Sequence, residues 1–124
     1  MPVTEFARLW LTAERRADSL EAAGAPEDSY LRGVCSTCEW LAGVIITVQG
    51  ARGPVGVFVR SPVTGVDGKA CEELIAEETR AAERALGDGR TGKPGFVDGA
   101  LATLVWAWRR SGVPPIEVQQ AQAG

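Results

Sequence analysis

Two cysteines separated by two residues, Cys35 and Cys38, form the clearest chemical motif in the sequence. A CxxC pair at the N-terminus of a helix has a lowered thiol pKa and can carry out redox chemistry. Here the pair falls in the middle of a helix predicted over residues 26–43, where the helix dipole gives a thiolate little support. Free cysteine is more often a small apolar core residue than a reagent, so we favour core packing. A thiol-dependent redox or metal-responsive role is the alternative.

A metal or catalytic site would need more side chains than this pair supplies. Zinc takes four ligands, whereas only Cys71 remains and the chain contains no histidine. The lack of histidine also removes the commonest general base. We therefore expect no catalytic residues, no metal site and no cofactor, and we do not expect an enzyme.

Four glutamates, Glu72, Glu73, Glu77 and Glu78, lie on one helix predicted over residues 68–86. Paired carboxylates can bind divalent metals or act as acid and base. No second helix supplies matching ligands such as an ExxH motif, so we interpret the cluster as a solvated helix face.

The last predicted helix, over residues 96–111, carries Trp106, Trp108 and Arg109, while Trp10 lies near the N-terminus. Tryptophan and arginine dominate the hot spots of protein interfaces. Trp106 and Trp108 cannot both face one narrow core, so we expect one of them to be partly exposed or to lie in a homodimer interface. These four residues are the candidate surface for a partner, which is another protein or a second copy of the chain.

The composition is that of an ordinary globular protein, with 124 residues, 45% of them apolar, and a net charge of −3. This length predicts a single domain. The acidic balance argues against binding to nucleic acid and against docking on an anionic membrane. No apolar run approaches the ~20 residues of a membrane helix, and the first residues lack the pattern of a signal peptide. We therefore expect a cytoplasmic protein.

Apolar residues recur at helical spacing in four segments, which we predict as helices over residues 4–23, 26–43, 68–86 and 96–111. Asp67 is the expected N-cap of the third of these helices.

The segment between the second and third predicted helices is rich in β-branched residues. VIITVQ and VGVFVR flank GARGP, which is the pattern of a short β-hairpin at about residues 44–60 with a five-residue loop. A continuation of the second helix to about Val48 is the alternative. Because a two-stranded hairpin is marginal in water, we expect such a hairpin to lie against the helices.

The second and fourth predicted helices share a residue pattern. The run YLRGVCSTCEWLAG from Tyr30 is matched by FVDGALATLVWAWR from Phe96. The coinciding residues include Gly33 and Gly99, Thr37 and Thr103, and Trp40 and Trp106. This repeat predicts an all-α fold, a four-helix bundle of two similar helical hairpins. The domain would comprise a hairpin over residues 4–43, a connector over 44–66, a second hairpin over 67–112 and a flexible tail over 113–124.

The runs YLRGVCSTCEWLAG, SPVT and GALATLVWAWRRSG resemble those of small uncharacterised proteins of high-GC actinobacteria, of the mobile-element or accessory type. The resemblance implies a regulatory or accessory protein and carries over no catalytic residue and no ligand. We therefore expect a small cytoplasmic accessory protein that acts by protein–protein binding.

Overall fold

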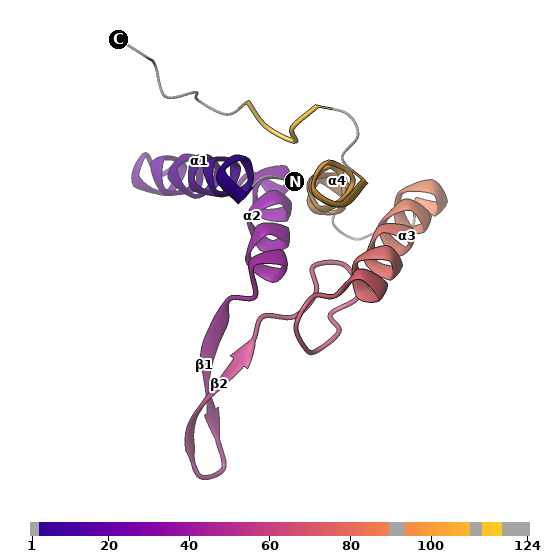
Figure 1. The fold of residues 1–124 in the computed structure, drawn as a ribbon. Helices are drawn as coiled ribbons and strands as arrows, with labels where there is room; N and C mark the ends of the chain where they lie inside the picture. Colours follow the sequence, from indigo (N-terminus) through magenta and orange to yellow (C-terminus); the bar gives the residue numbers. More distant parts are fainter. Residues whose placement is uncertain (1–2, 90–93, 110–112, 118–124) are drawn as a thin grey trace.

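Four α-helices, a π-helical turn and a two-stranded antiparallel sheet make up the described part of the chain (Figure 1). The computed structural model describes residues 3–89, 94–109 and 113–117. In chain order the elements are α1 (Val3–Ala22), α2 (Ser29–Ala42), β1 (Ile45–Gly50), β2 (Gly53–Phe58), α3 (Glu72–Asp88), α4 (Pro94–Leu104) and the π-helical turn η1 (Val105–Arg109).

Helices α2 and α4 pack against each other through a reciprocal pair of glycines. A Cβ atom on Gly33 of α2 would collide with the carbonyl oxygen of Phe96, and one on Gly99 of α4 would collide with that of Tyr30. Glycine, which has no Cβ atom, lets the two backbones approach this closely. The tight contact therefore fixes how α4 lies on α2.

A threonine one turn after each glycine directs its hydroxyl group back into its own helix. Thr37 donates to the carbonyl oxygen of Gly33 at 2.7 Å, and Thr103 donates to that of Gly99 at 2.8 Å. Both threonines are fully buried, where an unpaired hydroxyl group would be costly. The glycine and threonine positions shared by the two sequence runs thus have matching local structure.

A second part of the core lies where α1 meets α2. Leu9 and Ala13 of α1 are fully buried and join Val34 and Cys38 of α2 in one apolar cluster. Trp106, which is 8% exposed, belongs to the same cluster. Helix α3 packs against α4 on the side away from α1 (Figure 1).

The prediction of an all-α four-helix bundle made of two similar helical hairpins is wrong. The chain contains a β-hairpin as well as helices, and Figure 1 shows α1 lying across α2 instead of alongside it. Helix α2 is ended by Gly43, whose φ of 72° is left-handed, and the β-branched residues after it favour extended backbone. The fold is therefore a mixture of helices and an antiparallel hairpin.

Two predicted helix starts are displaced by local polar contacts. Helix α2 begins at Ser29, because the side chain of Asp28 accepts a hydrogen bond from a backbone N–H group in its first turn. Helix α3 begins at Glu72, four residues later than predicted. Asp67, the predicted cap, instead pairs with Arg60 at 2.9 Å.

The last predicted helix changes its winding before its end. Helix α4 stops at Leu104 and the chain continues as η1, so the segment is not a regular α-helix over residues 96–111. The final residues of that prediction lie outside the described part of the chain.

Residues 113–117 lie over α1 and α2. The guanidinium group of Arg16 donates to the carbonyl oxygen of Glu117, and the hydroxyl group of Tyr30 donates to that of Pro115, both at 2.8 Å. The rest of the predicted flexible tail is outside the described residues. Among the helices that the structure describes, none has the length and apolar content needed to cross a membrane.

Candidate functional site

A protruding hairpin, which we call the β-arm (Ile45–Phe58), is the surface feature that the helical body leaves unexplained. It starts directly after α2, where Gly43 and Val44 donate their N–H groups to the carbonyl oxygens of Trp40 and Glu39. These two bonds satisfy the last turn of the helix and redirect the chain. The N–H group of Val59 donates to the carbonyl oxygen of Val44 at 3.0 Å and closes the base of the arm.

The segment for which the sequence allows either a hairpin or a longer helix is a hairpin, with a shorter loop than the five residues predicted. Ala51 and Arg52 alone form the turn. Gly53 follows with a φ of 120°, which suits glycine. The cross-strand pairs are Ile45 with Phe58, Ile46 with Val57, Thr47 with Gly56, Val48 with Val55, Gln49 with Pro54 and Gly50 with Gly53.

This register gives the β-arm one face made of β-branched side chains. Directly opposed residues share a face and successive residues alternate between faces. The apolar face therefore consists of Ile46, Val48, Val55 and Val57, which are 45%, 40%, 47% and 36% exposed. The other face carries Ile45 and Phe58 beside polar and small residues, and Ile45 is 61% exposed.

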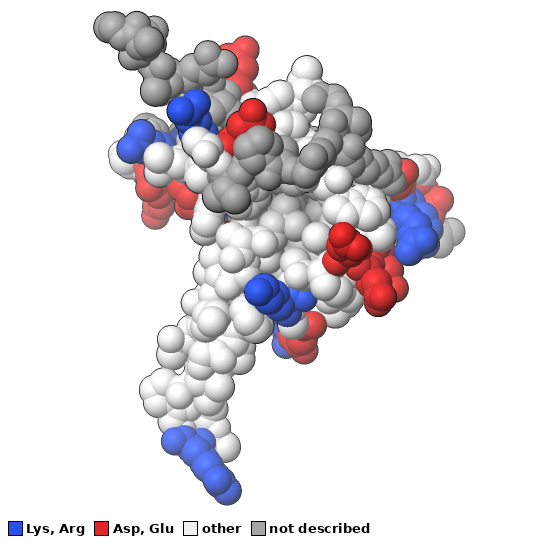
Figure 2. Space-filling model, viewed as in Figure 1, with Lys and Arg blue, Asp and Glu red and all other residues white. Residues whose placement is uncertain are grey.

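The β-arm extends away from the helices, so the expectation that it lies against them is wrong (Figure 1). Its six large apolar side chains are each at least 36% exposed: Ile45, Ile46, Val48, Val55, Val57 and Phe58. Figure 2 shows that the arm is uncharged along its length and positive at its tip. Arg52 is its only charged residue. Such a surface is typical of a site for another molecule.

The exit of the β-arm is fixed by a buried carboxylate on α3. Glu78 is 2% exposed. Its carboxylate accepts hydrogen bonds from the N–H groups of Val63 and Thr64 at 2.8 and 3.0 Å, and from the hydroxyl group of Thr64 at 2.6 Å. Hydrogen bonds to a charged acceptor are stronger than neutral ones. The loop after β2 is therefore held firmly to the helical body.

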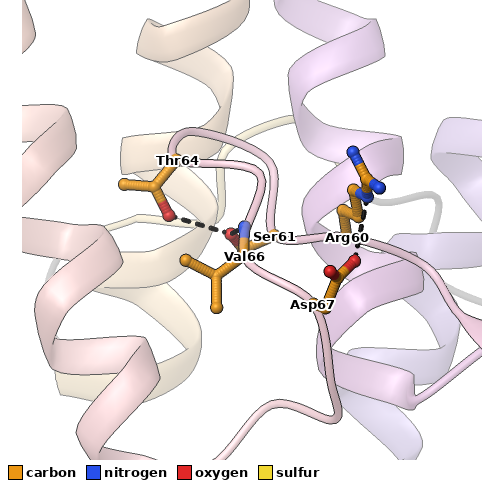
Figure 3. Close-up of polar contacts among 5 residues, drawn as sticks. All are labelled: Arg60, Ser61, Thr64, Val66 and Asp67. Carbon is orange, nitrogen blue, oxygen red and sulfur yellow. Dashed lines mark hydrogen bonds and ion pairs between the residues drawn. The ribbon is translucent and has the colours of Figure 1, made fainter.

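The same loop is closed on itself by Ser61 and by an ion pair (Figure 3). The hydroxyl oxygen of Ser61 accepts from the N–H group of Val66 at 2.8 Å and lies 3.0 Å from the hydroxyl oxygen of Thr64. The guanidinium group of Arg60 donates to Asp67 at 2.9 Å. Helix α2 on one side and this loop on the other give the arm a defined direction.

The glutamate cluster is not the solvated face that we predicted, because one of its members is buried. Glu72, Glu73 and Glu77 are exposed, whereas Glu78 holds the loop. Its spacing was the signal that we missed: Glu78 lies three residues after Ile75 and four before Ala82, and this spacing places all three residues on one face of the helix.

Cys35 and Cys38 lie in the core, 6% and 0% exposed. Burial, with a smaller contribution from the Glu14 carboxylate, raises the pKa of Cys35 to about 12. Burial also raises the pKa of Cys38 to about 12. Both groups are therefore thiols at neutral pH, which is unfavourable for redox chemistry. Within the described ranges, no group of three or more cysteine and acidic side chains could hold a metal ion.

The residues predicted to form a partner surface differ in their exposure to solvent. Trp106 is buried, whereas Trp108 is 39% exposed. Trp10 is partly buried and its indole N–H group donates to Glu14 at 3.1 Å. The side chain of Arg109 lies outside the described atoms. Trp10 packs against the core cluster that contains Trp106, and a partner surface at these four residues stays a prediction.

A groove of about 740 Å³ runs along α1. Arg8, Arg15 and Arg16 line it together with Leu11, which is 51% exposed, and Ile116. Its lining is mixed and largely open to solvent, in contrast to the continuous apolar face of the β-arm. The β-arm is therefore the stronger candidate for a binding site.

No protein family, curated protein or solved structure matches this chain.

Proposed function

We propose that this protein is a binding module that engages another polypeptide through the β-arm. The supporting observation is that four β-branched side chains form an uninterrupted, exposed face on a hairpin that extends from the helical body. Burying such side chains on binding is favourable, at about 25 cal/mol for each Å² removed from water. A two-stranded hairpin is marginal in isolation, so a partner would also stabilise the arm.

The charge of the arm favours a protein as its partner. A nucleic-acid surface would need several arginine or lysine side chains. Arg52 is the only one between residues 44 and 59. Neutral, β-branched surfaces with unpaired strand edges are instead suited to other polypeptides.

A capture experiment with matched variants tests this proposal. The wild-type protein, a Val48→Thr/Val55→Thr variant of the apolar face and a Leu11→Thr variant of the α1 groove are immobilised and exposed to an extract of the source cells. Each of the two variants replaces exposed apolar side chains by threonine, which carries a hydroxyl group. We expect the captured polypeptide, foreign or identical to the bait, to be lost from the β-arm variant alone. Loss from the Leu11→Thr variant, with full retention by the β-arm variant, would contradict the proposal.

A further inference from the structure

The two edges of the β-arm differ in the hydrogen-bonding groups that they present. The N–H group of Val59 donates to the carbonyl oxygen of Val44, which places these two residues at a hydrogen-bonded position of the antiparallel ladder. Such positions alternate with pairs whose backbone groups point outward. Ile45, Thr47 and Gln49 of β1 therefore direct their N–H and C=O groups away from β2. Within the described ranges, no backbone hydrogen bond outside the hairpin satisfies these groups.

The opposite edge is interrupted by proline. The outward-facing positions of β2 are Pro54, Gly56 and Phe58. Pro54 has no N–H group, and proline at such a position is a common way of preventing strand addition. The edge of β1 thus has a complete row of donors and acceptors, whereas the edge of β2 does not.

We propose that a second copy of this chain completes the β-arm: two β1 strands pair antiparallel, edge to edge, about a twofold axis at Thr47, giving a four-stranded sheet in the order β2–β1–β1–β2. This inference rests on the proposed function, since it names the partner of the same arm. It uses the complete edge and leaves the proline-containing edge outside.

The sequence of β1 is complementary to itself in this register. Thr47 lies opposite Thr47 of the second copy, and Ile45 lies opposite Gln49. On the apolar face, Ile46 comes beside Val48 of the second copy, so the two apolar faces merge into one. Cross-strand pairs of β-branched residues stabilise a sheet. The pairing also converts a marginal two-stranded hairpin into four strands with a shared hydrophobic face.

The charge at the tip of the β-arm fits the same register. Continuing the pairing along the strand brings Arg52 to the level of Ala42 of the second copy, at the C-terminal end of α2. The C-terminal end of a helix carries partial negative charge and favours a cation. The two Arg52 side chains would lie at opposite ends of the paired strands and would not repel each other.

Cysteine cross-linking tests the axis directly. A Cys71→Ser background removes the exposed native thiol, since Cys35 and Cys38 are buried. In this background, Thr47→Cys places two thiols on opposed residues, with Cα atoms ~5.5 Å apart, which permits a disulfide. Gln49→Cys is the matched control on the same edge. In this register Gln49 lies opposite Ile45 of the second copy, so the two introduced cysteines are offset by four residues along the strands, ~13 Å. With diamide as the oxidant, we expect a covalent dimer from Thr47→Cys and monomer from Gln49→Cys.

A pair of proline variants tests the edge without changing the intramolecular ladder. Thr47→Pro and Gly56→Pro each remove one outward N–H group, the first from the edge of β1 and the second from the edge of β2. We expect the wild type and Gly56→Pro to be dimers by light scattering, and Thr47→Pro to be monomeric. A far-ultraviolet circular dichroism spectrum equal to that of the wild type would show that each variant is folded.

Three results would overturn the inference. These are a wild-type protein that stays monomeric at all accessible concentrations, equal cross-linking of the two cysteine variants, and a dimer that survives Thr47→Pro. A monomer whose Val48→Thr/Val55→Thr variant loses a foreign partner would refute the second copy while leaving the proposed binding function intact. A monomer whose apolar-face variant loses nothing would refute both.

Discussion

Gly33 of α2 and Gly99 of α4 make the same contact from opposite sides of one helix interface. The Cβ position of Gly33 falls on the backbone of Phe96 and Ala100, and that of Gly99 falls on the backbone of Tyr30 and Val34. The two contacts together hold the helix from which the β-arm emerges.

We expect Gly33→Ala or Gly99→Ala to lower the free energy of unfolding by at least about 2 kcal/mol, because the added methyl group meets backbone atoms that cannot rotate away. Gly87→Ala is the matched control, since Gly87 also lies in a helix and has open space around its Cβ position. It should be neutral or stabilising by about 0.5 kcal/mol. Urea unfolding of the three variants measures these differences, and equal effects at all three positions would contradict the close contact.

Replacing the buried carboxylate should loosen the base of the β-arm. Glu78→Gln offers one oxygen where the loop presents several donors, so we expect a loss of about 1.5–3 kcal/mol in unfolding free energy. The amide protons of Val63 and Thr64 should also exchange faster with solvent. Glu77→Gln, a neighbouring exposed change, should stay within about 0.5 kcal/mol of the wild type. If both variants behave alike, the anchoring role of Glu78 is refuted.

The buried thiols predict a loss of stability at alkaline pH. Burial raises the pKa of Cys35 and Cys38 from 9.0 to about 12. The unfolded chain therefore releases these protons above pH 9, whereas the folded chain keeps them until about pH 12. Because the folded state then binds more protons, its stability should be unaffected below pH 9 and fall between pH 9 and 12.

The expected size is roughly 2 kcal/mol or less for each thiol near pH 10.5. Urea unfolding at about pH 8 and about pH 10.5 measures it, with a Cys35→Ala/Cys38→Ala variant to remove the contribution and Cys71→Ala as the exposed control. A loss that is as steep in the double variant as in the wild type would show that other groups are responsible.

The helical parts of this structure follow from the sequence more readily than the β-arm does. Helical spacing of apolar residues locates α1 and α2, and the shared glycine and threonine positions mark the contact between α2 and α4. The spacing is a local signal within one helix, and the shared glycine and threonine positions mark residues that face each other across the interface. These signals do not specify the angle at which α1 crosses α2, which depends on packing across the whole interface.

The direction of the β-arm and the role of Glu78 depend on contacts between distant segments. Apolar strands are normally buried, so the sequence of residues 44–60 predicted a hairpin against the helices. We predict Glu78 to lie on a solvated face because no second helix supplies matching ligands such as an ExxH motif. Its partners, Val63 and Thr64, lie in a loop whose position no local pattern reveals.

Residue-resolved hydrogen exchange at increasing protein concentration tests the binding role of the β-arm most directly. The account predicts that the outward amides of Ile45, Thr47 and Gln49 slow by roughly tenfold or more as the partner copy binds, while those of Gly56 and Phe58 remain fast. The amide of Val48, bonded within the hairpin, serves as the internal reference. Outward amides of β1 that exchange as freely in concentrated as in dilute protein, and that stay fast when cell extract is added, would contradict the account.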